Sequence, residues 1–178
     1  MSDMLDTRSS WLSHEELDQA RERLPMVYVD AVPVRTDAQG SVTEVGLLLR
    51  AMPDGTISRA VVSGRVLYGE RVRDALLRHL EKDLGPMALP QVPPSPQPFT
   101  VIEYFPDPQV TGFTDPRQHA VSLVFIVPVA GDCAPSQDAL DLVWVTPHEA
   151  AAPEFQAEMS GGHGRLVRMA LAHCGLLP

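Results

Sequence analysis

The chain has 178 residues, of which 44% are hydrophobic and 21% are charged, and its net charge is −9. This length and balance fit one soluble globular domain whose core forms without disulfide or metal cross-links. The acidic charge argues against general binding of nucleic acid or of an anionic membrane, because both need a basic protein surface. It is compatible with a small phosphate ligand held by a local basic cluster.

The two cysteines, Cys133 and Cys174, lie far apart and share no metal-type spacing. They are typical of free thiols in a reducing compartment. The first residues lack the basic and apolar regions of a secretory signal, and no stretch reaches the roughly 18 apolar residues of a membrane helix. The sequence therefore predicts a cytoplasmic protein. The preference for Arg over Lys, with many Ala, Pro and Val residues, suggests a GC-rich bacterial genome.

The N-terminal region is predicted to be separate from the main domain. We expect a polar tail and an accessory helix over residues 1–25, followed by one domain over residues 26–178. Ser13 and Glu16 have the spacing of a capping box at a helix N-terminus. The helix cannot continue through Pro25, which has no backbone N–H to donate.

Strand-type segments follow the accessory helix. Apolar runs at 26–35 and 42–51 predict a β-hairpin, because the turn residues Asp37 and Gly40 separate them. Residues 56–63 predict a third strand. The hairpin and this strand would precede the one long amphipathic segment of the chain.

The second half of the chain predicts further strands and two more helices. Residues 86–98 hold six prolines, which exclude a helix or a central strand and indicate an extended connection within the domain. Mixed strands and helices predict an α/β (α+β) domain, with a mixed sheet packed between helices and an extra N-terminal helix. The remaining elements are expected as strands at 99–105, 119–129 and 140–145, a short helix from Pro147 capped by Thr146, and a last helix within 161–175.

The amphipathic helix expected over residues 71–84 has an unusual charge pattern. At helical spacing its aliphatic side chains form one core-facing stripe: Val72, Leu76, Leu77, Leu80 and Leu84. A basic row of Arg71, Arg78 and Lys82 flanks the stripe, beside the ionisable pair His79 and Asp83. Lys82 is the only lysine of the chain. On its own the pattern is typical of a solvated charged face.

The residues around this helix make the chain similar to the Nudix hydrolase superfamily. That family's box is Gly, five residues, Glu, seven residues, then Arg-Glu-aliphatic-any-Glu-Glu-any-Gly-aliphatic. Gly64, Glu70, Arg78 and Gly85 match it without an insertion. The segment WVTPHEA and the order of the flanking strands extend the resemblance to roughly residues 26–174. It implies a Nudix-like fold, and the chain also resembles small uncharacterised Nudix-like proteins of actinobacteria.

The box is degenerate at the positions that carry metal chemistry. The family's glutamates on this helix hold Mg²⁺ or Mn²⁺, and hard cations of this kind need several oxygen ligands. Here His79, Lys82 and Asp83 replace three of those glutamates. The resemblance implies Asp83 and Glu70 as the remaining metal ligands. It implies Glu70, His79 and Asp83 as catalytic residues, with His79 as a candidate general base because an unperturbed histidine has a pKa of about 6.5.

Lys82 inverts the charge of a metal-ligand position. In one interpretation Lys82 acts as a fixed cation for a phosphate, with Arg71 and Arg78 in the same row. A site of this kind needs little or no metal. The alternative is a decayed site in which Lys82 pairs with an acidic neighbour such as Asp83. Other weaker candidates are the acids Glu103 and Asp115 as further metal ligands, and the glycine-rich turn 160–164 as an anion contact.

Two functions remain open from the sequence. The first is a Nudix-type hydrolase acting on a nucleoside diphosphate linked to another group, dependent on Mg²⁺ or Mn²⁺ and weakly active because of the altered site. The second is a catalytically inactive Nudix-fold protein that binds a nucleotide-like ligand or a protein partner. The predicted partner is a small nucleotide-like ligand, with a protein partner as the alternative in the second function. Neither function predicts nucleic acid or membrane as a partner. The N-terminal helix is a candidate contact in a homodimer.

Overall fold

The computed structural model describes residues 11–52, 54–137 and 139–177. The predicted tail lies mostly in residues 1–10, outside the described residues. In chain order the elements are α1 (His14–Arg23), β1 (Met26–Thr36), β2 (Val42–Ala51), β3 (Ile57–Ala60), β4 (Val62–Arg65), α2 (Val72–Leu84), β5 (Thr100–Tyr104), α3 (Pro108–Thr111), β6 (Ala120–Pro128), β7 (Asp141–Val145), α4 (Pro147–Ala151), α5 (Pro153–Ala157) and α6 (His163–His173).

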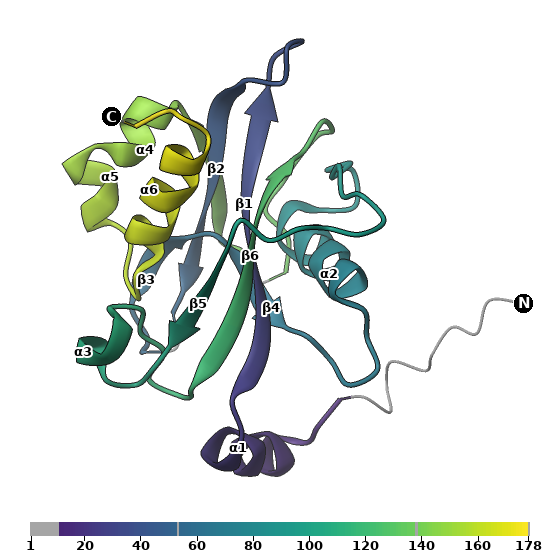
Figure 1. Ribbon diagram of the computed structural model, residues 1–178, viewed down its shortest axis with the longest axis vertical. Helices are drawn as coiled ribbons and strands as arrows, with labels where there is room; N and C mark the ends of the chain where they lie inside the picture. The colour runs from purple at the N-terminus through teal and green to yellow at the C-terminus, as the bar shows by residue number, and fades with distance from the viewer. Residues whose placement is uncertain (1–10, 53, 138, 178) are drawn as a thin grey trace, which may run out of the picture.

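The strands form one mixed sheet in the order β3-β2-β1-β6-β5, with β4 also pairing with β1 and β7 with β2 (Figure 1). β1 and β6 pair in parallel, from Met26 opposite Ala120 to Val34 opposite Pro128. The other strand pairs are antiparallel, including the predicted hairpin of β1 and β2. The prediction of a mixed sheet is confirmed.

Helices cover both faces of the sheet, with α2 on one face and α4, α5 and α6 on the other (Figure 1). Side chains alternate along β1, as they must in an extended strand. Val29 and Ala31 therefore pack into the core cluster under α2, while Val32 and Val34 pack into the cluster that contains residues of α6. The mixed α/β architecture with an added N-terminal helix, which lies at one end of the sheet, is confirmed.

The third predicted strand, 56–63, is wrong as a single element. It is two strands, because β3 pairs with β2 and β4 pairs with β1. The switch occurs at Val61, whose backbone N–H donates to Nδ1 of His163 over 3.2 Å. Residue types alone could not show this, since both halves are rich in strand-forming residues. The switch places Gly64 opposite Val29, beneath α2.

The helix ends follow the local sequence signals. Ser13 and Glu16 form the predicted capping box at α1, and Thr146 and Glu149 form another at α4. Two helices of one turn or little more, α3 and α5, were not predicted. None of the helices in the described part of the chain has the length and hydropathy that crossing a bilayer requires.

Candidate functional site

The loop before α2 is fastened to the helix by an ion pair. Arg78 donates from Nε to one carboxylate oxygen of Glu70 over 2.8 Å and from Nη2 to the other over 2.9 Å. The backbone N–H of Leu67 also donates to Glu70 over 2.9 Å, and Arg78 reaches the Arg65 carbonyl over 3.0 Å. Burial alone would raise the pKa of Glu70, but the hydrogen bonds from Arg78 and Leu67 outweigh it and lower the pKa. Both oxygens of this carboxylate are thus engaged.

His79 is buried on the inner side of α2, behind Gly64. Its Nε2 lies 2.9 Å from the carbonyl oxygen of Arg65, which can only accept, so Nε2 carries the proton. A Cβ at Gly64 would collide with the imidazole ring. Burial lowers the pKa of His79 to about 4, so the ring is neutral at neutral pH. This environment fits a packing role.

Asp83 is fully buried, with two cationic side chains beside it. Nζ of Lys82 lies 3.2 Å from Oδ1, and Nη1 of Arg50 lies 3.8 Å from Oδ2. The side chains of Arg50 and Lys82 are each 18% exposed, whereas that of Asp83 is 1% exposed. Arg50 comes from the end of β2 and Lys82 from the last turn of α2. The carboxylate therefore holds two cations from different elements.

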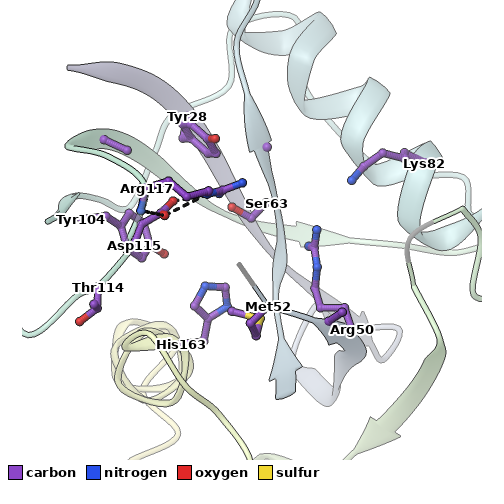
Figure 2. A pocket seen from close by; sticks show the side chains of 13 residues that line it. Tyr28, Arg50, Met52, Ser63, Lys82, Tyr104, Thr114, Asp115, Arg117 and His163 are labelled. Atoms are coloured by element: carbon purple, nitrogen blue, oxygen red, sulfur yellow. Dashed lines mark hydrogen bonds and ion pairs between the residues drawn. The ribbon is translucent and has the colours of Figure 1, made fainter. Parts of the chain in front are cut away.

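A cavity of about 320 Å³ opens in front of these cations. Its walls come from β1, β2, β4, α2, the segment before β6 and the start of α6 (Figure 2). Arg50 and Lys82 point into it from one side and Arg117 lies on the other (Figure 2). Tyr28 and Tyr104 add aromatic surface. The cavity therefore combines cationic and aromatic lining in a chain of strong negative net charge.

The wall formed by the segment before β6 is held together by hydrogen bonds. Arg117 donates from Nε and Nη2 to the two oxygens of Asp115, over 3.0 and 2.9 Å (Figure 2). Gln118 donates to Asp115 and to the Tyr28 hydroxyl, each over 2.8 Å. Burial would raise the pKa of Asp115, but the hydrogen bonds from Arg117 prevail and lower it. Both oxygens of Asp115 are engaged.

The floor of the cavity carries a buried polar cluster that the sequence did not reveal. Nδ1 of His163 accepts the hydrogen bond from Val61, so the proton of its neutral ring is on Nε2. Burial lowers the pKa of His163, which favours this neutral form. The Tyr104 and Ser122 hydroxyls donate to Asp30 over 2.9 and 2.7 Å. Burial also raises the pKa of Tyr104, which keeps its hydroxyl protonated.

The structure brings only some of the sequence-derived site residues to this cavity. Gly64 and Lys82 line it, and Asp83 lies beside Lys82. Arg71 does not join them: its side chain is 76% exposed and pairs with Asp74 on the outer side of α2. Of the two further acids, Asp115 lines the cavity, whereas Glu103 pairs with a surface histidine.

The other predicted residues have mainly structural surroundings. Arg78 and Glu70 bind each other, and His79 packs behind Gly64. Gly85 ends α2 with a φ of 87°, a conformation that favours glycine. Sequence reasoning missed Arg50 and Arg117. The one signal for Arg50 was a charged residue at the end of the apolar run LLLRA.

The residues present do not fit the divalent cation that the family resemblance implies. Glu70 has both oxygens occupied, and Asp83 has two cations within 4 Å. A further cation near Asp83 would be repelled by Lys82 and Arg50. Across the described residues, no group of three His, Cys, Asp or Glu side chains could hold a metal ion. No reaction step is therefore assigned to a metal.

Solved structures of similar fold identify the fold of this chain. The chain matches the Nudix domain of NrtR from Shewanella oneidensis, solved with ADP-ribose, at 15% identity and a TM-score of 0.62, covering 97% of this chain and 99% of that one. It also matches a bifunctional NMN adenylyltransferase/ADP-ribose pyrophosphatase from Francisella tularensis, solved with AMP and a manganese ion, at 18% identity and a TM-score of 0.52, covering 85% and 42% of the two chains. These similarities show a Nudix fold.

A nearer relative and a family complete the comparison. A protein from Jonesia denitrificans, described as a possible asymmetric diadenosine tetraphosphate (Ap4A) hydrolase, is 64% identical with a TM-score of 0.84, covering 88% of this chain and 98% of that one. None of the curated proteins searched matches the chain. The family described as domain of unknown function DUF4916 matches residues 7–176. The chain therefore belongs to the DUF4916 family and has the Nudix fold.

Proposed function

We propose that the cavity beside α2 binds a nucleoside diphosphate linked to another group, of the kind represented by ADP-ribose and Ap4A. The observation that carries the proposal is the convergence of Arg50, Lys82 and Arg117 on one cavity of about 320 Å³. Phosphate oxygens accept charge-assisted hydrogen bonds from such groups. In a chain of net charge −9, three cationic side chains around one cavity favour an anionic ligand.

The rest of the cavity suits the remainder of such a ligand. Its volume is at the lower end of the range of small-molecule sites, and such sites usually combine apolar walls with a few polar groups. Tyr28 and Tyr104 supply aromatic surface for a base or a ribose, and His163 presents a neutral imidazole. The ligand in the Shewanella relative and the description of the Jonesia relative both point to the same class of compound.

Hydrolysis of that ligand is the second candidate function. It is favoured by the 64% identical relative described as a possible Ap4A hydrolase. The carboxylates that the family uses with Mg²⁺ or Mn²⁺ are here replaced or engaged, so we expect slow turnover at most. The catalytic roles of Glu70, His79 and Asp83 remain part of this second candidate.

Isothermal titration calorimetry with ADP-ribose and Ap4A tests the binding proposal. We expect saturable binding that Arg50→Gln weakens by about tenfold or more, because a charge-assisted hydrogen bond is lost. Arg71→Gln is the control, since it removes one positive charge from the outer side of α2. Absence of binding by both ligands, or equal loss in the two variants, would contradict the proposal.

Chromatographic detection of AMP, ADP or ATP tests the second candidate. The purified protein is incubated with Ap4A or ADP-ribose and with Mg²⁺ or Mn²⁺. Turnover that scales with protein concentration and is lost in Asp83→Asn supports hydrolysis. Binding without turnover supports the inactive, ligand-binding alternative.

We also propose a cytoplasmic location, because a reducing compartment keeps cysteines as free thiols. Cys133 and Cys174 are both free thiols in the structure. A homodimer that uses α1 as a contact is a separate proposal. α1 buries none of its residues, so one face of it is available to a second subunit. Light scattering of the full chain and of a chain lacking α1 tests the dimer.

A further inference from the structure

We infer that Arg50 and Lys82 take the place of a divalent cation, so that this cavity binds phosphate without metal. The inference rests on the proposed binding of a phosphorylated ligand in the same cavity. It concerns how the phosphate charge is neutralised, which the family resemblance assigns to Mg²⁺ or Mn²⁺.

Two cationic side chains lie next to the carboxylate of Asp83. This buried carboxylate lies 3.2 Å from the Lys82 ammonium and 3.8 Å from the Arg50 guanidinium. Asp83 thus anchors two cations at the wall of the cavity, and it does so from a position where the family has a metal-binding glutamate.

The two cations, Arg50 and Lys82, are directed toward the cavity and not toward bulk protein. Both side chains line the cavity and point into it (Figure 2). Each is 18% exposed, whereas the side chain of Asp83 is 1% exposed. A phosphate entering the cavity therefore meets Arg50 and Lys82 before it meets any carboxylate of α2. Arginine offers a planar set of donors for two phosphate oxygens, and lysine adds a point charge.

The nearby acids Glu70 and Asp115 are already engaged in hydrogen bonds. Glu70 accepts from Arg78 and Leu67, and Asp115 accepts from Arg117 and Gln118, so both carboxylates have all their oxygens in hydrogen bonds. A divalent cation at Glu70 or Asp115 would compete with these arginines for the carboxylate oxygens. A phosphate needs no such rearrangement.

The test is calorimetric titration with inorganic pyrophosphate and with ADP-ribose, in EDTA and in Mg²⁺. For wild type we expect the dissociation constants of ADP-ribose to agree within about twofold in the two buffers, and pyrophosphate to bind in EDTA, since the fixed cations already neutralise the ligand. Lys82→Gln should weaken pyrophosphate binding by about tenfold or more. Arg71→Gln, on the outer side of the same helix, should leave it unchanged.

A second variant probes the metal directly. Lys82→Glu restores the residue type of the family at this position, and electron paramagnetic resonance measures the loss of free Mn²⁺. We expect little Mn²⁺ binding by wild type and at least about tenfold stronger binding by Lys82→Glu, because a cation is replaced by a carboxylate. Thermal unfolding of each variant verifies that it is folded. The wild-type titrations test the inference even if a variant does not fold.

The outcomes separate the two proposals. If ADP-ribose binds only when Mg²⁺ or Mn²⁺ is present, the inference fails and the proposed function stands. If pyrophosphate and ADP-ribose bind in neither buffer, the proposed function fails and this inference fails with it. Stoichiometric Mn²⁺ binding by wild type would also overturn the inference.

Discussion

Gly64 of β4 and His79 of α2 are in close contact. The imidazole ring lies where a side chain at position 64 would have to go, so the glycine is required by the space and not by its backbone angle. The ring is anchored by the Arg65 carbonyl and is buried. The neutral ring thus packs against the strand beneath α2.

Gly64→Ala should lower the free energy of unfolding by about 1–3 kcal/mol, because overpacking forces β4 or His79 to move. In the His79→Ala background the same change should cost much less, since the collision is removed. Chemical denaturation of the four proteins of this double-mutant cycle measures the coupling. Equal costs in the two backgrounds would show that the ring does not fill this space.

His79 should also make stability depend on pH. Its pKa is about 4 in the folded protein and about 6.5 when unfolded, so between these values the unfolded chain binds the extra proton. Stability should therefore fall by roughly 3 kcal/mol as the pH drops from 6.5 to 4. His163, whose pKa is also lowered by burial, contributes in the same direction.

The variant His79→Gln isolates the contribution of His79 to the pH dependence of stability. Glutamine can still donate to the Arg65 carbonyl but does not titrate. We expect a shallower fall of the unfolding midpoint between pH 6.5 and 4 in this variant than in wild type. Parallel pH curves for the two proteins would mean that His79 has an ordinary pKa.

At the scale of elements, α2 depends on the loop that precedes it. α2 has no side-chain cap at its N-terminus, and Arg71 at that position forms only an exposed pair with Asp74. The loop is held instead by Glu70, which links Arg78 on the helix to the backbone of Leu67. Because α2 carries Lys82 and β4 carries Gly64, this link fixes one side of the cavity.

Glu70→Gln should lower the free energy of unfolding by about 1–3 kcal/mol, because Arg78 loses a charged partner in a largely buried pair. Arg71→Ala breaks the exposed pair with Asp74 and should leave stability close to that of wild type. Urea denaturation of both variants makes the comparison. A larger loss from Arg71→Ala than from Glu70→Gln would contradict this account of the loop.

At the scale of the whole molecule, the N-terminal helix is attached to a domain that already has two cores. Leu17 and Ala20 of α1 pack against one core cluster without being buried. Arg21 donates from Nε to the Gln118 side chain over 3.0 Å. Gln118 in turn holds Asp115 at the cavity wall. The helix therefore supports the cavity wall through Arg21 and Gln118.

Removal of residues 1–25 should leave one cooperative unfolding transition. We expect its midpoint to fall by roughly 2–8 °C, as a loss of about 1–2 kcal/mol gives at this size. Differential scanning calorimetry of the full and shortened chains measures it, and circular dichroism verifies the fold. Loss of the transition would show that residues 26–178 do not fold as a separate domain.

The sequence predicted most of the elements, and its failures have identifiable causes. The capping boxes of α1 and α4 depend on contacts three residues apart, so they could be found in the sequence. The division of residues 56–63 into β3 and β4 depends on His163, about a hundred residues away, and could not be found. For the same reason the sequence suggested Arg71 for the cavity and omitted Arg50.

The sequence by itself determined the spacing from Gly64 to Gly85, the apolar stripe of α2 and the order of most strands and longer helices, because each depends on near neighbours along the chain. Only the tertiary structure decided that Arg50 meets Lys82 over Asp83, and that His79 is buried and neutral. These properties arise from burial and from contacts between β2, β4 and α2, which are distant in sequence. Where these three elements meet, the burial of a side chain and the charges beside it are set by tertiary packing.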